Sequence, residues 1–203
     1  MKKILSLLTI ILSVSSTASA GEPMKNTNLA TFAGGCFWCI QPAFDNLEGV
    51  TRTTVGYSGG TAADATYEKV SAHETEHRET IQIEYNPAKV TFTQLLERFM
   101  RNIDPTDNEG QFADKGPQYR TAIYYHDDTQ KKEAEAYFKM LKETMQFKYP
   151  IYTEVIPYVN FFAAEDYHQK YSEKNPERYN AYKYGSGRPA VLKKVWGEEG
   201  GEH

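Results

Sequence analysis

The two cysteines of this 203-residue chain, Cys36 and Cys39, have only Phe37 and Trp38 between them. A disulfide that closes so short a loop removes little conformational entropy from the unfolded chain, so the pair is poorly suited to stabilising a fold. A Cys-x-x-Cys pair indicates thiol–disulfide chemistry, although thioredoxin-like pairs usually enclose small residues or proline. Two large rings beside a reactive sulfur favour a dry cage for a small apolar group of a substrate.

The residues around the pair predict that the thiols lie at the start of a helix. The glycine pair Gly34-Gly35 precedes them, and apolar residues follow at the one-face spacing of a helix. Because Pro42 is tolerated only in a first turn, we expect this helix to begin near Trp38 or Cys39. Cys36 would then face unpaired backbone N–H groups and the positive end of the helix dipole, which favour the thiolate. Cys39 would lie one turn further on, so the pattern predicts an attacking and a resolving thiol.

The remaining pattern predicts an α+β fold. Alternating apolar residues predict strands, and apolar residues spaced three and four apart predict amphipathic helices. The strands are expected at 28–33, 50–57, 80–85, 119–125 and 153–158, and the helices at 91–103 and 129–145. The first six elements in chain order follow the split βαβ plan. We therefore predict a ferredoxin-like two-layer sandwich with a mixed sheet, an extra helix–strand pair and an irregular C-terminal tail with one or two short helices.

The first twenty residues have the organisation of a signal peptide. Two lysines precede an apolar run over residues 4–14, and a small-residue stretch ends at Ala18-Ser19-Ala20. The apolar run is too short to span a bilayer, which needs about 20 residues. We expect cleavage after residue 20, export to the periplasm or the exterior, and no stable insertion in a membrane.

Composition fits one globular domain, which we place at residues 21–196 with a disordered tail at 197–203. Hydrophobic residues make up 40% of the chain and charged residues 25%. The net charge is −4, and removing residues 1–20 takes away two lysines and no acidic residue. An acidic chain without a basic cluster argues against nucleic acid as a partner. We expect a monomer.

A second motif suggests a different class of protein. His73 to His77 fits the HExxH pattern of zinc proteases, in which two histidines one helical turn apart bind the metal and Glu74 is the base. That motif requires a helix with a buried apolar face, whereas charged residues flank this one and a predicted strand follows almost at once. We therefore expect no metal site and no bound cofactor.

The sequence Gly-Cys-Phe-Trp around Cys36 is followed by several further blocks along the chain. They are Gly56-Tyr57-Ser58-Gly59-Gly60, Thr66-Tyr67, His77-Arg78-Glu79, Tyr85-Asn86-Pro87, Asp114 through Tyr119-Arg120, and Gly185-Ser186-Gly187-Arg188. These blocks, in this order, resemble those of the A-type peptide methionine sulfoxide reductases, and the resemblance covers roughly residues 29–188.

The resemblance implies a role for each matching residue. The Cys36 thiolate would attack the sulfoxide sulfur, leaving a sulfenic acid and methionine. Glu79 would protonate the oxygen, for which burial must raise its pKa. The remaining roles are methyl recognition by Phe37 and Trp38, hydrogen bonding to the oxygen by Tyr67 and Tyr119, and a polar pocket position for Asp114. The substrate would be methionine S-sulfoxide, free or in peptides and proteins.

The chain departs from the family pattern at Cys39. Many members have glycine there and place resolving cysteines in a C-terminal tail, where this chain has none. Either Cys39 or an external thiol must resolve the sulfenic acid, and we expect a disulfide between Cys36 and Cys39. A thioredoxin-like dithiol would then reduce it. The remaining alternative is a thiol–disulfide exchange module that does not turn over sulfoxides.

Overall fold

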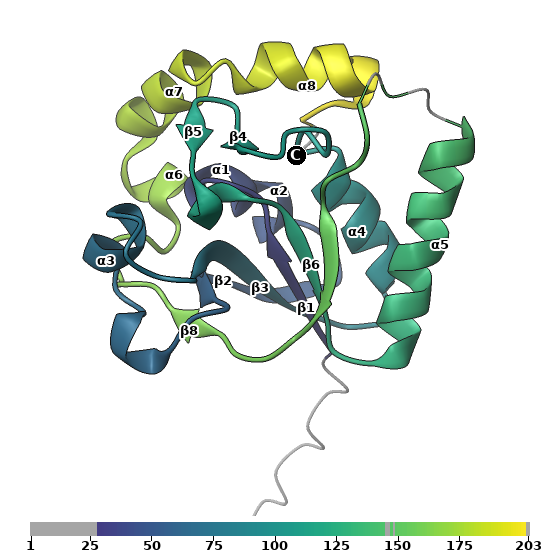
Figure 1. Cartoon of the computed structure of the whole chain (residues 1–203), viewed down its shortest axis with the longest axis horizontal. Helices are drawn as coiled ribbons and strands as arrows, with labels where there is room; N and C mark the ends of the chain where they lie inside the picture. The colour runs from purple at the N-terminus through teal and green to yellow at the C-terminus, as the bar shows by residue number, and fades with distance from the viewer. Residues whose placement is uncertain (1–27, 145–146, 148, 202–203) are drawn as a thin grey trace, which may run out of the picture.

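A mixed sheet lies at the centre of the protein, seen in a computed structural model that describes residues 28–144, 147 and 149–201 (Figure 1). The strands follow the order β7-β6-β1-β3-β2-β8. Their bounds are β1 Asn28–Ala33, β2 Val50–Ser58, β3 Arg78–Tyr85, β6 Ala122–Tyr125, β7 Glu154–Pro157 and β8 Phe162–Ala163. The strands β4 Gly110–Gln111 and β5 Asp114–Lys115 form a separate small hairpin.

The four central strands have the predicted ferredoxin-like topology. They lie in the order β6-β1-β3-β2, and each pairs antiparallel with its neighbour. The strand β7 pairs parallel with β6, which makes the sheet mixed. The prediction of an α+β fold with a mixed sheet and an extra helix–strand pair is therefore confirmed.

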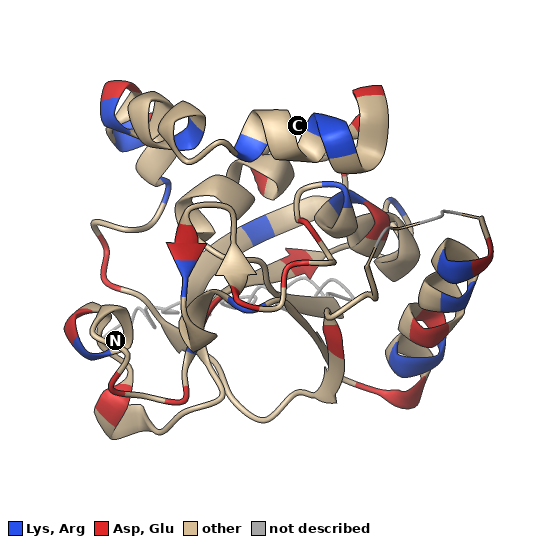
Figure 2. Ribbon diagram, turned by 45° about the horizontal axis from the view of Figure 1, so that its top comes forward, with Lys and Arg blue, Asp and Glu red and all other residues tan. Residues whose placement is uncertain are grey.

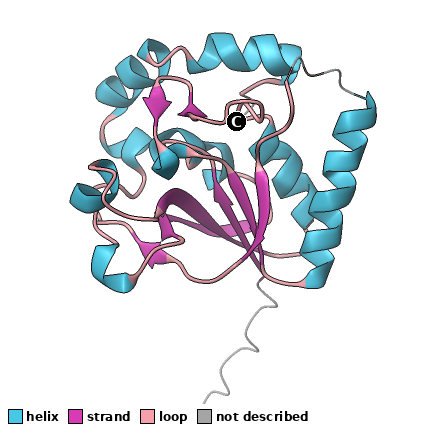
Figure 3. Ribbon diagram, viewed as in Figure 1, coloured by secondary structure: helices cyan, strands magenta, loops and turns pink. Residues whose placement is uncertain are grey.

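Helices surround the sheet, as the coloured ribbon in Figure 3 shows. Their bounds are α1 Phe37–Ile40, α2 Pro42–Asp45, α3 Tyr67–Ser71, α4 Phe92–Met100, α5 Asp128–Thr144, α6 Tyr171–Lys174, α7 Pro176–Gly185 and α8 Arg188–Trp196. Acidic and basic residues are mixed along α5, as expected of a helix with one face in water (Figure 2). Within the described residues no helix is both long and apolar enough to cross a bilayer.

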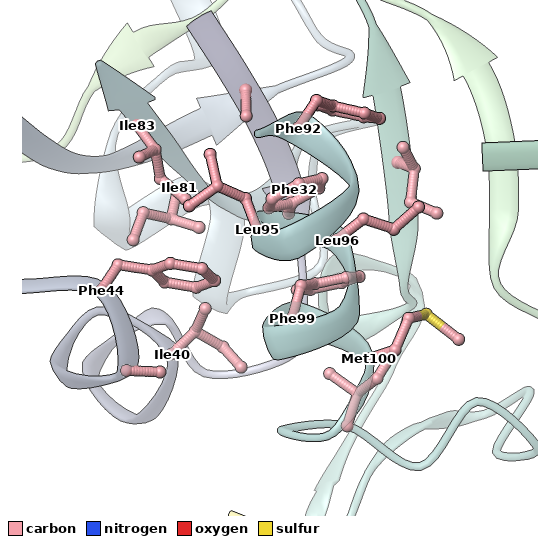
Figure 4. Packing of buried hydrophobic residues seen from close by; sticks show 14 of the residues in the cluster. Phe32, Ile40, Phe44, Ile81, Ile83, Phe92, Leu95, Leu96, Phe99 and Met100 are labelled. Atoms are coloured by element: carbon pink, nitrogen blue, oxygen red, sulfur yellow. The ribbon is translucent and has the colours of Figure 1, made fainter. Parts of the chain in front are cut away.

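Aromatic packing fixes the end of β1, which leads directly into the segment that carries the two cysteines, residues 34–39. The ring of Phe32 stacks on Phe99 of α4 with 4.6 Å between centroids, and packs against Phe44 and Phe92 (Figure 4). Thr91 begins α4 with a capping box, in which its hydroxyl accepts from the N–H of residue 94. Burying each large side chain stabilises the fold by about 1.5–3 kcal/mol, so the position of this strand end is strongly determined.

The prediction of one helix from Trp38 or Cys39 onward is wrong. The segment forms two single turns, α1 and α2, with Gln41 between them and Pro42 as the first residue of the second. Proline has no N–H to donate and clashes with the carbonyl four residues earlier, so it ends one helix and begins another. Cys36 does precede the first residue of α1, as predicted.

The predicted strand at 119–125 and the predicted tail also differ from the structure. Residues Pro117–Tyr119 form a 3-10 turn, so β6 begins only at Ala122. Among its described residues the tail contains three α-helices, followed by a 3-10 turn at Gly197–Glu199. Hydrogen bonds hold this end in place, from Trp196 Nε1 to the carbonyl of Ile103 and from the N–H of Gly201 to the carbonyl of Arg101. The predicted signal peptide lies outside the described residues.

Candidate active site

A tight turn brings Cys36 from the end of β1 to the start of α1. Gly35 has φ +77°, a conformation that costs other residues energy. A Cβ on Gly35 would lie 2.6 Å from the side chain of Gln111, and one on Gly34 would lie 2.8 Å from Phe99. The glycine pair is therefore needed both for backbone conformation and for close packing beneath the cysteine.

Most of the residues predicted from the sequence line one cavity of about 80 Å³. Its walls come from the cysteine segment, α3, β3, β5, the 3-10 turn and α7. The lining residues are Cys36, Phe37, Trp38, Tyr67, Glu79, Asp114, Tyr119 and Tyr182. Of the predicted residues only Cys39 does not line the cavity, and of the lining residues only Tyr182 was not predicted from the sequence.

The two thiols are free, buried and hydrogen-bonded to each other. Cys36 is 6% exposed, and Cys39 is 1% exposed among Tyr171 and Tyr179. Burial raises the pKa of Cys36 well above its usual value, while the hydrogen bond from the Cys36 thiol lowers the pKa of Cys39 to about 7. Desolvation therefore opposes the stabilisation of the Cys36 thiolate that the sequence predicts at a helix start, and the role of Cys36 as the attacking thiol stays a prediction.

Glu79 is a buried acid beside the nucleophile. Its side chain, 2% exposed on β3, accepts a hydrogen bond at Oε2 from the backbone N–H of Phe37 at 2.9 Å. Burial raises the pKa of Glu79 to about 8 despite that hydrogen bond. The carboxyl is therefore protonated at neutral pH, as a proton donor must be.

The other polar groups of the cavity are two tyrosines and an aspartate. Burial raises the pKa of Tyr67 to about 12 and also raises that of Tyr119, so both phenols remain neutral hydrogen-bond donors. The backbone N–H of Tyr67 is anchored on Glu165 at 2.9 Å. Asp114 accepts a hydrogen bond from the hydroxyl of Tyr182, and burial raises its pKa.

Residues from the C-terminal part of the chain hold the Trp38 ring. The indole stacks on Tyr171 at 3.8 Å with an interplanar angle of 5°, and its Nε1 donates to His168 Nδ1 at 2.9 Å. The ring of His168 also packs on Phe37. His168 and Tyr171 were not identified from the sequence; the tyrosine-rich tail after residue 164 was the available signal.

The HExxH segment does not form a metal site. Residues 73–77 are turn and bend, with His73 at φ 63°, so its two histidines do not share a helix face. Both ring nitrogens of His77 are engaged, one accepting from the N–H of Gly60 and the other bonded to the carbonyl of Thr61. Across the described part of the chain, no group of three His, Cys, Asp or Glu side chains is placed to hold a metal ion. The zinc-protease alternative is therefore wrong.

A reduced cysteine pair, a protonated carboxyl and an aromatic cage on a ferredoxin-like sheet define a cysteine-dependent oxidoreductase. The family model described as peptide methionine sulfoxide reductase matches residues 28–200. The chain is 48% identical to peptide methionine sulfoxide reductase MsrA of Bacillus licheniformis, over 86% of this chain and 97% of the relative. It is 47% identical to the Bacillus subtilis MsrA, over 85% of this chain and 98% of the relative. The chain belongs to the A-type peptide methionine sulfoxide reductase family.

Solved structures agree with this assignment. The reduced form of Mxr1 from Saccharomyces cerevisiae superposes with a TM-score of 0.69 at 33% identity, covering 77% of this chain and 89% of that one. Methionine sulfoxide reductase A of Corynebacterium diphtheriae gives 0.66 at 32% identity, covering 77% of each chain. Mxr1 in complex with Trx2 gives 0.50 at 25% identity, covering 74% of this chain and 87% of that one.

Proposed function

We propose that the chain reduces methionine S-sulfoxide, free or in proteins, with Cys36 as nucleophile, Cys39 as resolving cysteine and a thioredoxin-like dithiol as reductant. The observation that carries this proposal is the buried Glu79 carboxyl in the cavity that the Cys36 thiol shares with Phe37 and Trp38, where burial raises the pKa of Glu79 to about 8. A sulfoxide needs these three things together: a nucleophile for sulfur, a proton for oxygen and an apolar site for its methyl group.

In the first step Cys36 Sγ attacks the sulfoxide sulfur while Glu79 donates its proton to the oxygen. The oxygen moves to the cysteine, which becomes a sulfenic acid, and methionine leaves. The proton lost by the Cys36 thiol replaces the one that Glu79 donates, so the step has no net change in protons. The sulfoxide gains two electrons and Cys36 loses two. Tyr67 and Tyr119 donate hydrogen bonds to the oxygen as negative charge develops on it.

In the second step Cys39 Sγ attacks the sulfenic sulfur of Cys36. The S–S bond forms and the hydroxyl leaves as water, so both thiols end oxidised in one disulfide. Two observations support Cys39: it is the only other cysteine of the chain, and its thiol is hydrogen-bonded to that of Cys36.

A dithiol protein then reduces the disulfide by two thiol–disulfide exchanges, which leaves the reductant oxidised. The similarity to Mxr1 crystallised with Trx2 supports a thioredoxin-like reductant. Cys36 is the more exposed of the two sulfurs, so we propose that the reductant attacks it first and that the Cys39 thiolate leaves.

The direct test is a steady-state assay with separated methionine sulfoxide epimers and a thioredoxin system. Wild type should turn over the S epimer, and Cys36→Ser should be inactive. Cys39→Ser should complete one turnover and then recycle poorly with thioredoxin. Reduction of insulin disulfides without sulfoxide turnover would support the thiol–disulfide exchange alternative, and normal recycling of Cys39→Ser would remove its resolving role.

We also propose that the protein acts after export, since residues 1–20 have the order of a signal peptide. Expression of the full chain in a bacterial host should give a mature protein that begins at Gly21 in the periplasmic fraction. N-terminal sequencing that finds residues 1–20 retained in the cytosolic fraction would contradict this.

A further inference from the structure

The carboxylate of Glu165 contacts two separate parts of the active site. Glu165 lies in the segment between β8 and α6, which passes beside α3 (Figure 1). Its Oε1 accepts a hydrogen bond at 2.9 Å from the backbone N–H of Tyr67, the first residue of α3. Its Oε2 accepts from the hydroxyl of Tyr57 at 2.8 Å and lies 3.9 Å from Nε2 of His168. One carboxylate therefore lies between a wall of the cavity and the histidine that holds Trp38.

The hydrogen bond from Trp38 fixes the tautomer of His168. Nδ1 of His168 accepts from the indole Nε1–H at 2.9 Å, so this nitrogen carries no hydrogen. Burial lowers the pKa of His168, so the ring is neutral at pH 7 and its one hydrogen is on Nε2. That N–H is buried, has no hydrogen-bond partner among the described residues, and lies 3.9 Å from Oε2 of Glu165. A negative charge there favours the tautomer that accepts from Trp38.

The Glu165 carboxyl carries that negative charge at neutral pH. Burial opposes its ionisation, but the hydrogen bonds that it accepts from the Tyr67 N–H and the Tyr57 hydroxyl outweigh burial and lower the pKa of Glu165. An ionised carboxylate can only accept hydrogen bonds. Each of its oxygens therefore attracts the N–H groups that face it, that of Tyr67 on one side and that of His168 on the other.

We propose that Glu165 is a positioning residue that orders both halves of the substrate site, an inference that rests on the proposed function. Through Oε1 it holds the backbone of Tyr67, whose hydroxyl donates to the sulfoxide oxygen. Through its charge it selects the His168 tautomer that accepts from Trp38, whose ring encloses the methyl group. Glu165 does not line the cavity, so it acts through these partners and not on the reacting atoms.

Glu165→Gln and Glu165→Ala separate the two contacts. In Glu165→Gln an amide oxygen can still accept from the N–H of Tyr67, but the NH2 group in place of Oε2 cannot accept from Nε2–H of His168. We expect the His168 hydrogen to move to Nδ1, so that the Trp38 indole loses its acceptor. KM for the sulfoxide should then rise several-fold, while kcat stays within about twofold of wild type. Glu165→Ala also frees the N–H of Tyr67 and should lower kcat about tenfold.

A cycle with His168→Ala tests whether the effect on KM passes through the histidine. If it does, Glu165→Gln should raise KM no further in the His168→Ala background. The matched control is Asp166→Asn, which removes one negative charge at the next residue, an exposed one, and should leave KM and kcat unchanged. A KM of Glu165→Gln within twofold of wild type would overturn the proposal, as would an equal rise in KM in both backgrounds.

The Trp38 contact can also be measured without substrate, by NMR hydrogen exchange of the indole N–H groups. The chain has two tryptophans, and Nε1 of Trp196 donates to the carbonyl of Ile103, so its signal is an internal reference. In Glu165→Gln the Trp38 indole N–H should exchange about tenfold faster, while that of Trp196 stays unchanged. Unchanged exchange at Trp38 would overturn the role of Glu165 even if the protein reduces sulfoxides. Faster exchange in a protein whose wild type does not reduce sulfoxides would support the contact and overturn the proposed function instead.

Discussion

The backbone N–H of Phe37 donates to Glu79 Oε2 at 2.9 Å, joining the first residue of α1 to the second residue of β3. This bond holds the Glu79 carboxyl beside Phe37, the first residue after the nucleophile. The hydrogen bond favours the ionised carboxylate, but burial outweighs it and keeps the pKa of Glu79 at about 8. The acid and the nucleophile are thus placed by the same short helix.

Glu79→Gln should separate the proton-donating role from the positioning role. Glutamine retains an oxygen that accepts from the N–H of Phe37, but its amide has no acidic proton near neutral pH. We therefore expect the rate of sulfoxide reduction to fall about 100-fold at pH 7. The advantage of wild type over Glu79→Gln should decline as pH rises through about 8, where the carboxyl ionises. Stopped-flow measurement of methionine release from pH 6 to pH 9.5 checks this.

The matched control is Glu84→Gln, which alters a carboxyl on the same strand that pairs with Arg52. This variant should keep the wild-type rate and pH profile. A constant ratio between wild type and Glu79→Gln across the whole pH range would show that Glu79 is not the proton donor.

The same carboxyl should make the protein less stable as pH rises. Glutamate in the unfolded chain ionises near pH 4.3, as expected from model peptides, while the pKa of folded Glu79 is about 8. Between these values the unfolded state binds fewer protons than the folded state, so the contribution of Glu79 to the free energy of unfolding falls with rising pH. Urea unfolding at pH 5 and pH 8 should show Glu79→Gln gaining stability relative to wild type. If the two proteins differ by the same free energy of unfolding at pH 5 and at pH 8, the Glu79 carboxyl is not buried in its protonated form.

His168 should act through Trp38. In His168→Ala the indole N–H loses its acceptor, so we expect the Trp38 ring to lose its fixed orientation and KM for the sulfoxide to rise several-fold more than kcat falls. His168→Asn places an amide oxygen near the position of Nδ1 and should recover most of the lost affinity. Equal KM values for wild type and His168→Ala would show that this hydrogen bond does not shape the substrate site.

Gly35 and Gly187 offer a controlled test of the turn beneath Cys36. Their φ values, +77° and +76°, are nearly the same, but a Cβ would meet Gln111 at 2.6 Å in the first and nothing within 4 Å in the second. Both alanine variants should lose about 1 kcal/mol from backbone conformation. Only Gly35→Ala should lose further stability and displace Cys36, with a large drop in kcat. If Gly35→Ala and Gly187→Ala change kcat and the urea midpoint equally, the packing argument is refuted.

The sheet was predictable because its signals are local, and most of the cavity was predictable because the chain resembles a known family. Alternating residues placed the β3 strand, and a capping threonine with one-face apolar spacing placed α4. The resemblance to the family supplied Glu79, Tyr67, Tyr119 and Asp114, all of which line the cavity.

The rest depends on contacts that no local pattern encodes. Tyr182 lies on α7, whose polar and aromatic residues lack a clear one-face apolar spacing, and it reaches Asp114 only through the tertiary fold. The burial of Cys36 was also missed. A helix of one turn offers this thiol little dipole stabilisation, and the burial that raises its pKa comes from tertiary packing and not from the Cys-x-x-Cys sequence.

The most direct test of the account is to mix the reduced protein with excess methionine S-sulfoxide without any reductant, then count released methionine and remaining free thiols per chain. Wild type should release one methionine and lose both thiols, ending with a disulfide between Cys36 and Cys39. Cys39→Ser should also release one methionine and retain a sulfenic acid at Cys36. Release of methionine by Cys36→Ser, or a wild-type protein that keeps the Cys39 thiol free after its turnover, would contradict the assignment of the two cysteines.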